Sequence, residues 1–150
     1  DNTPAFLVRL NADQDISHAT ATKILFDSEE YDTDSAFASN KFTVPTGKGG
    51  MYQFTTGIHL PYLDDGERLA TDYRVNGTGI SRGRMFQWYA GADNDDNMRW
   101  SYSVTLTLAA DDYVEVYVSH DEGATRPIDG GSSQSNSHTF LSGFKISGVS

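Results

Sequence analysis

The sequence predicts an all-β fold, an antiparallel jelly-roll sandwich of about ten strands, and three observations support this prediction. Apolar and polar residues alternate over several stretches, which is typical of half-buried strands. No stretch combines a helical period of apolar residues with a capping residue. Turn signals rich in Gly, Asn and Asp separate the alternating stretches at short intervals, as in sandwiches and jelly rolls.

The first half of the chain is expected to form four strands. Residues 5–10 place Phe6, Val8 and Leu10 on one face. The stretch that starts at the glycine pair Gly49–Gly50 has its large apolar residues on one parity and polar residues on the other. The expected strands are residues 5–10, 22–27, 41–45 and 50–60.

The second half continues the pattern. The stretch from Met98 to Leu108 alternates apolar residues with Ser, Thr and Arg over its whole length, and Val114, Val116 and Val118 share one face of the next stretch. The expected strands are residues 68–76, 84–90, 98–109, 113–119 and 138–147.

Composition indicates one domain, residues 1–150, with a sizeable core. The chain has no cysteine, so disulfides and thiolate metal sites are excluded. A net charge of −10 argues against nucleic-acid partners, and no apolar run is long enough for insertion into a membrane. Because the chain starts at Asp1 without a methionine, we expect a processed product or a piece of a longer protein.

Alternate loops of an antiparallel sandwich lie at the same end. We therefore expect the loops near 61–67, 91–97 and 120–137 at one end, where most of the acidic excess would gather, and those near 46–49, 77–83 and 110–112 at the other. Residues 130–137 have low complexity and are expected to form a flexible loop. Long loops at one end of a rigid β-scaffold are a usual place for binding.

The acidic loops offer oxygen ligands of the kind that Ca²⁺ prefers. "GADNDDN", residues 91–97, is the first candidate, through Asp93, Asp95 and Asp96. "LDDGE" is the second, through Asp64 and Asp65. The alternative is a solvated acidic turn that holds no ion.

Three other motifs favour structural roles. "GISRG", Gly79–Gly83, matches the G-x-S-x-G of serine hydrolases, but no helix follows it, so a turn is expected. Asn76–Gly77 indicates a hairpin turn, although Asn76 also begins a formal glycosylation sequon. The four histidines show no metal-ligand spacing and are expected to be surface histidines with hydrogen bonds: His18, His59, His120 and His138. We therefore predict no enzymatic activity.

Three blocks of residues, in order, resemble a known family. The first block contains Phe26, Tyr31, Asp32, Asn40, Phe42, Pro45, Gly50, Tyr52 and Phe54. The second contains Leu106, Leu108, Asp112, Val114 and Val116, and the third contains Thr139, Phe140, Gly143 and Phe144. Together they resemble the globular heads of the complement component 1q family, in the tumour-necrosis-factor-like jelly-roll superfamily. Asp111 departs from the family pattern, which has glycine in that turn.

The resemblance implies a homotrimer around a threefold axis, often at the end of a stalk, with both termini near the stalk. Aromatic side chains are the candidates for subunit contacts: Tyr52, Trp88, Tyr89, Trp100, Tyr102 and Tyr117. The alternative is that they fill the core of the subunit itself.

The function expected from this resemblance is a surface-displayed recognition or adhesion head that binds a glycan or protein receptor, with possible help from Ca²⁺. Candidate ligand-binding residues lie in the outer loops: Tyr62, Asn94, Asn97 and Asp121. Tyr73 is a further candidate for stacking on sugars. The alternative is a structural trimerisation, capping or capsid-decoration module without a ligand. In either case we expect an extracellular or virion-surface location and a viral or bacterial source.

Overall fold

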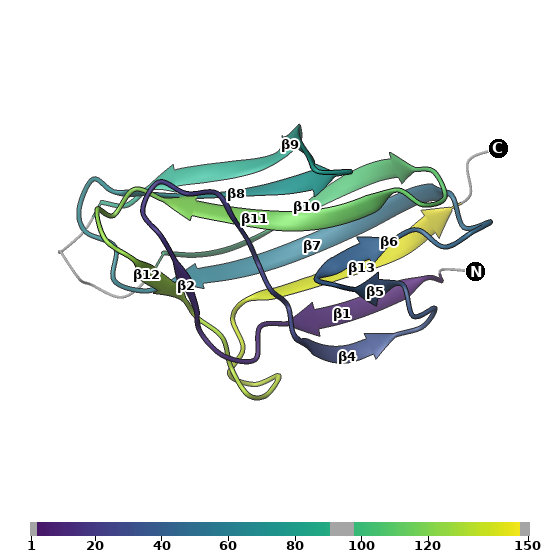
Figure 1. Cartoon of the computed structure of the whole chain (residues 1–150), viewed down its shortest axis with the longest axis horizontal. Helices are drawn as coiled ribbons and strands as arrows, with labels where there is room; N and C mark the ends of the chain where they lie inside the picture. Colours follow the sequence, from purple (N-terminus) through teal and green to yellow (C-terminus); the bar gives the residue numbers. More distant parts are fainter. Residues whose placement is uncertain (1–2, 91–97, 148–150) are drawn as a thin grey trace.

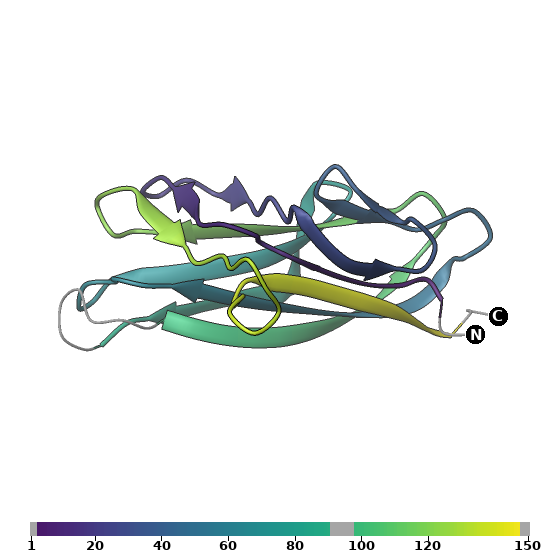
Figure 2. The same cartoon turned by 90° about the horizontal axis from the view of Figure 1, so that it is seen from below.

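The computed structural model describes residues 3–90 and 98–147, and thirteen strands run through this part of the chain (Figure 1). Two antiparallel sheets pack face to face, as the view from below shows (Figure 2). None of the described residues forms a helix that is long and apolar enough to cross a membrane. The all-β, antiparallel prediction is therefore confirmed.

The first sheet has the strand order β10-β7-β13-β1-β4. Its strands are β10 (Met98–Leu108), β7 (Gly50–Leu60), β13 (Phe140–Ser147), β1 (Ala5–Arg9) and β4 (Ser28–Asp32). The first and last long strands of the chain thus lie side by side, with Ala5 opposite Phe144.

The second sheet has the order β5-β6-β11-β8-β9, and β3 pairs with β11 beside this path. Its strands are β5 (Phe37–Ala38), β6 (Lys41–Thr43), β11 (Tyr113–His120), β8 (Arg68–Val75), β9 (Thr78–Trp88) and β3 (Thr22–Lys23). A small third sheet pairs β12 (Arg126–Ile128) with β2 (Gln14–Ile16). Strands that are distant in sequence therefore become neighbours in both main sheets, as in a jelly roll.

Aromatic rings from both sheets fill the core. Phe6 of β1 stacks on Phe42 of β6 with centroids 5.0 Å apart, and Phe54 of β7 meets Phe42 edge-on at 5.5 Å. All three side chains are fully buried. Burial of each such ring contributes roughly 1.5–3 kcal/mol to folding, and ring pairing adds to it.

The predicted strands 50–60 and 98–109 match β7 and β10 closely, but four short strands, β2, β4, β5 and β12, were missed. Of the predicted strand 22–27, only β3 forms, because the Gln14 side chain makes hydrogen bonds with the backbone here that a neighbouring strand would otherwise make. This side chain donates to the Lys23 carbonyl at 2.9 Å and accepts from the Leu25 N–H at 2.9 Å. A side chain that completes a sheet leaves no periodic signal in the strand it contacts.

The hairpin at Asn76–Gly77 is confirmed. Both residues have positive φ, 51° and 81°, which the type I′ turn requires. The turn expected at Gly79–Gly83 is wrong, because these residues lie inside β9, which begins at Thr78. A register shift between Asp72 and Arg74 accommodates this glycine-rich part of the strand.

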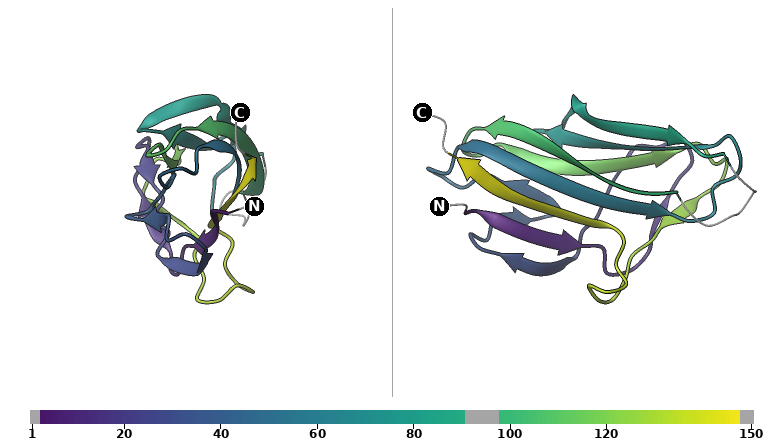
Figure 3. Two further views of the ribbon diagram at one scale, coloured as in Figure 1. Left: turned by 90° about the vertical axis from the view of Figure 1, so that its right-hand side faces the viewer. Right: turned by 180° about the vertical axis from the view of Figure 1, so that it is seen from behind.

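The two ends of the sandwich differ as the loop order predicted. The start of β1 and the end of β13 lie together, and the Lys145 N–H donates to the Pro4 carbonyl at 3.0 Å. The loops after β7 and after β11 lie at the opposite end (Figures 1 and 3). The Asp121 N–H donates to the Arg68 carbonyl at 3.2 Å, which ties the second loop to the strand that follows the first.

Candidate functional site

The loop end opposite the termini is built around a buried carboxylate. Glu122 accepts hydrogen bonds from the Asp64 N–H at 3.0 Å and from Arg126 Nη2 at 2.6 Å. His120 is buried beside it, with Nδ1 accepting from the Glu122 N–H and Nε2 donating to the Ile16 carbonyl at 2.7 Å. These contacts fix the loop after β11 against the loop after β7.

Negative charge is concentrated at this loop end. The pKa of Glu67 is raised above its ordinary value, first by loss of hydration and then by a hydrogen bond with Asp121 and the charges of Asp121, Glu122 and Asp64. Asp121, a predicted ligand-binding residue, uses one carboxylate oxygen to accept from the Arg68 N–H at 2.5 Å. The predicted gathering of acidic side chains is therefore observed for the loops after β7 and β11.

Tyr62, the other predicted ligand-binding residue among the described loops, is exposed on this end. Its side chain is 49% exposed and its φ is +65°, a left-handed backbone conformation that non-glycine residues seldom adopt. Such strained positions occur often at functional sites. Asn94 and Asn97 lie outside the described residues.

The predicted calcium ligands also lie partly inside and partly outside the described residues. Asp93, Asp95 and Asp96 lie outside the described residues. Among residues 3–90 and 98–147, a single group of three His, Cys, Asp or Glu side chains has its ligand atoms within 4.8 Å of one another, and it contains neither Asp64 nor Asp65. That group is His59, Asp129 and His138.

This histidine cluster joins three segments. His59 is on the outward face near the end of β7, Asp129 directly follows β12, and His138 lies two residues before β13. Asp129 Oδ2 lies 3.1 Å from His59 Nδ1 and 2.5 Å from His138 Nδ1. Burial acts to raise the pKa of Asp129, but hydrogen bonds from His138 and His59 and their positive charge outweigh it and lower the pKa below its ordinary value.

The sequence did not identify this cluster, because 70 residues separate His59 from Asp129. The observed pairing of β7 with β13 explains the contact. Gly57 lies opposite Phe140, and the Asp129 N–H donates to the His59 carbonyl at 2.9 Å, so the segment before β13 must pass His59.

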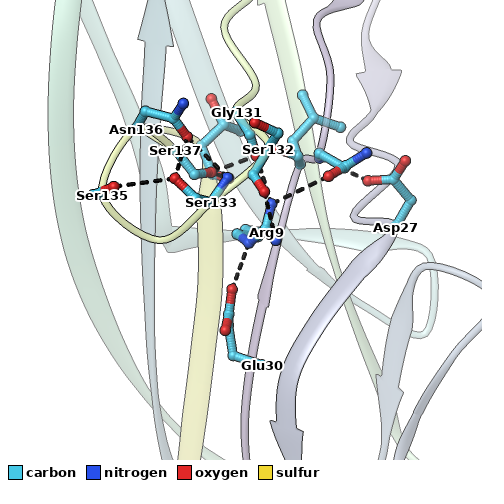
Figure 4. Close-up of polar contacts among 12 residues, drawn as sticks. Arg9, Asp27, Glu30, Gly131, Ser132, Ser133, Ser135, Asn136 and Ser137 are labelled. Carbon is cyan, nitrogen blue, oxygen red and sulfur yellow. Dashed lines mark hydrogen bonds and ion pairs between the residues drawn. The ribbon is translucent and has the colours of Figure 1, made fainter.

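The segment 130–137 is attached to the sheet, where a flexible loop was expected. Arg9 donates to the Gly131 carbonyl at 2.5 Å and pairs with Glu30 at 2.5 Å, while Asn136 accepts from the Ser133 N–H at 2.9 Å (Figure 4). These bonds fix a hollow of about 330 Å³ whose apolar lining includes Leu7 and Phe140.

The outward face of the first sheet carries no charged side chain across the described centre of three strands. The outward positions of β10, β7 and β13 there are Ser101, Ser103, Thr105, Thr107, Met51, Gln53, Thr55, Gly57, Phe140, Ser142 and Phe144. In a chain with 32 charged residues, 11 basic and 21 acidic, this is an unusual composition for a solvent face. Depletion of charge is typical of the centre of a subunit interface.

The predicted interface aromatics lie at several places. Tyr52 is fully buried and donates to the Lys48 carbonyl, so its assignment to subunit contacts is wrong, because even-numbered positions of β7 point between the sheets. Tyr73 is also fully buried, so it cannot stack on a sugar. Burial raises the pKa of Tyr102 to about 12, and its hydroxyl donates to the Gly83 carbonyl.

The other four predicted interface aromatics differ in exposure and position, and their role in subunit contacts stays a prediction. Trp88 is 56% exposed on the edge strand β9. Trp100 and Tyr89 pack against the core from its margin. Tyr117 lies on the outward face of the second sheet, where the Arg74 guanidinium sits 3.6 Å from its ring centroid.

Comparison with solved structures defines the class of fold. The globular domain of the zebrafish complement 1qA protein is 17% identical, with a TM-score of 0.64, over 98% of this chain and 100% of that chain. The vertex protein P5 of PRD1 is 13% identical, with a TM-score of 0.67, over 98% and 99%. The tumour necrosis factor Eiger of S. frugiperda is 17% identical, with a TM-score of 0.58, over 97% and 94%.

The chain therefore has the jelly-roll fold of complement 1q heads and tumour necrosis factors, which confirms the resemblance drawn from the sequence. None of the three structures is named as an enzyme. A scan against protein-family models finds no match, and a search of curated proteins finds none either.

Proposed function

We propose that the chain is a homotrimeric recognition head, displayed outside a cell or on a virion, that binds a receptor or glycan through the loops opposite its termini. The observation that carries this proposal is the absence of charged side chains from the outward positions at the described centre of β10, β7 and β13. A charged group enclosed there would lose its hydration, so a chain with net charge −10 gains from keeping this face neutral where subunits meet.

The complementary surface is the edge strand β9. Phe86 and Trp88 are 59% and 56% exposed, the highest values among the large exposed apolar side chains of the described residues. A trimer with threefold symmetry joins two different surfaces of each subunit. In our proposal, the aromatic edge of one protomer packs on the uncharged centre of β10, β7 and β13 of the next, and the hollow beside Phe140, which the Arg9–Glu30 pair also lines, accepts a large side chain.

Assembly in this direction leaves the acidic loop end exposed. Tyr62 and Asp121 would contact the receptor or glycan there, and Asn94 and Asn97 belong to the same proposed surface. Aromatic rings beside polar groups suit carbohydrate, because the ring covers an apolar sugar face while the polar groups bond its hydroxyls. Calcium bound through Asp64 and Asp65, or through Asp93, Asp95 and Asp96, is the assisting ion of this proposal.

A structural module is the second candidate, because PRD1 P5, whose fold this chain shares, is named a vertex protein. Such a module would use the same trimer contacts to cap a stalk or decorate a capsid, without a ligand at the loop end.

Binding of the 150-residue chain to a glycan panel, with Ca²⁺ and then with EDTA, separates the two functions. A recognition head should bind a defined set of glycans, and Tyr62→Ala should remove that binding while the trimer persists. Leu25→Ala is the control, since Leu25 is 46% exposed and follows β3, outside the loops after β7 and β11. Trimers that bind no member of the panel and no cell surface would favour the structural module.

A further inference from the structure

The His59–Asp129–His138 cluster has the composition of a metal site. Two imidazole Nδ1 atoms and one carboxylate oxygen converge from three separate segments of the chain. Catalytic and exchangeable zinc sites commonly have three protein ligands of these types and one open position. Imidazole nitrogen favours Zn²⁺, Co²⁺, Ni²⁺ and Cu²⁺, whereas Ca²⁺ favours oxygen ligands alone.

The distances permit an ion between the three side chains. Metal–ligand bonds of about 2.0–2.2 Å place tetrahedral ligand atoms roughly 3.3–3.6 Å apart. Asp129 Oδ2 is now 3.1 Å from His59 Nδ1 and 2.5 Å from His138 Nδ1, so the ligand atoms must separate by about 1 Å at most. The ion would replace the protons through which both imidazoles now bond the carboxylate.

The frame around the cluster is fixed while one side remains accessible. The Asp129 backbone is bonded to His59, and the Leu10 N–H donates to the Thr139 carbonyl at 2.9 Å, so the backbone is held next to all three ligands. The His59 side chain is only 6% exposed, whereas that of His138 is 34% exposed. In the single subunit, His138 lines a hollow of about 330 Å³ together with Trp100 and Arg99, which gives an ion a route in before subunits assemble and a place for a fourth ligand.

We propose that His59, Asp129 and His138 bind one divalent transition-metal ion per chain, with Zn²⁺ as the physiological candidate. The site is separate from the carboxylates proposed for Ca²⁺, and the proposal does not depend on the trimer. A bound ion would attach both ends of the segment 129–138 to β7, because Asp129 is the first residue of this segment and His138 is the last.

Isothermal titration of the EDTA-treated, dialysed 150-residue chain with ZnSO₄ tests the proposal. We expect one Zn²⁺ per chain, undisturbed by millimolar Ca²⁺, and a visible absorption band of tetrahedral type when Co²⁺ replaces Zn²⁺. His138→Asn and Asp129→Asn keep a hydrogen bond within the cluster but remove a metal ligand. Each should weaken zinc binding at least about 10–100-fold, the loss known for supporting residues around metal sites.

His18→Asn is the matched control, because His18 bonds the Gly123 N–H through its own Nδ1 but is no member of the cluster. This variant should bind Zn²⁺ as the wild type does. Zinc should also raise the melting temperature of the wild type and leave that of Asp129→Asn unchanged. No saturable zinc binding by the wild type, or equal binding by all three variants, would overturn the proposal.

Discussion

The outward face of the second sheet carries ion pairs, whereas the described outward centre of β10, β7 and β13 carries no charge, and the ion pair of the first sheet, Arg9 with Glu30, lies at its β1–β4 edge. On the second sheet, Arg74 pairs with Asp72 at 2.9 Å and Lys23 pairs with Glu115 at 2.8 Å. On the first sheet, hydroxyl, amide and apolar side chains occupy the described centre of β10, β7 and β13. In both sheets, outward residues alternate with core residues along each strand, so the periodicity of the sequence cannot distinguish the two outward faces.

In our proposal, the absence of charge, more than hydrophobicity, distinguishes the assembly surface. An ion pair on a solvent face costs little and contributes little, so nothing selects against it. A charge enclosed between subunits loses its hydration, which costs several kcal/mol unless it is well paired. The predictions below test this interpretation in order of decreasing effect.

A single charge at the centre of the neutral face should have the largest effect. Ser103 is exposed in the subunit and hydrogen-bonds Thr55 at 2.7 Å, so Ser103→Asp should fold. In the trimer it would enclose an unpaired carboxylate in each subunit, at a cost of several kcal/mol each. We expect the mass measured by light scattering to fall to that of one chain.

The control for this variant lies on the other sheet. Ala38→Asp places the same charge on the exposed strand β5, opposite Lys41 and at the edge of the second sheet farthest from β9. It should leave the trimer intact. Equal behaviour of the two variants would remove the distinction between the faces.

Truncation of the exposed edge tryptophan should have the next largest effect. Trp88→Ala removes a side chain that is 56% exposed in the subunit, so the thermal stability of the monomer should change little. If Trp88 is an interface anchor, its loss weakens association by about 2 kcal/mol or more, roughly 30-fold in the dissociation constant. Analytical ultracentrifugation over a concentration series measures this change, and an unaltered dissociation constant would exclude β9 from the interface.

Loss of charge from the second sheet should affect folding alone, and weakly. Arg74→Met removes the pair with Asp72 and the contact with the Tyr117 ring. We expect a decrease of about 1 kcal/mol in the free energy of unfolding, with an unchanged trimer. Urea denaturation gives the first quantity, and dissociation of the variant at micromolar concentration would show that this face also contributes to assembly.

The turn at the terminal end should give the smallest effect, and it depends on pH. Asp112 accepts from Asn76 Nδ2 at 2.8 Å and from the Ala109 N–H at 2.7 Å, and these bonds lower its pKa. A lowered folded-state pKa stabilises the fold above the ordinary carboxyl pKa, and the contribution disappears as the pH falls through the folded value. Asp112→Asn should therefore be less stable by about 1 kcal/mol or less at pH 7 and equal to the wild type at the lowest pH.

The sequence could predict those parts of the fold in which one strand carries its own signal. β7 and β10 were predicted almost to the residue, because alternation over eleven positions defines a half-buried strand. β5 and β12, of two and three residues, were missed because their partners define them. The alternation of β7 indicated that the parity of Tyr52 faces inward, but Tyr52 was still assigned to subunit contacts, because aromatic side chains are also enriched at interfaces.

The candidate sites were predictable only where neighbouring loops form them. The acidic loop end followed from the order of the strands, since alternate loops meet at one end. The histidine cluster depends on strand register, because the pairing of Gly57 with Phe140 brings His138 back to His59. No spacing within the sequence expresses that contact.

Sedimentation equilibrium of the 150-residue chain in EDTA tests the central claim most directly, because it measures assembly without any metal. We predict a mass near three times 16.5 kDa over a wide range of concentrations. A species of 16.5 kDa throughout that range would show that the neutral face of the first sheet does not join subunits, and would contradict the proposal of a trimeric head.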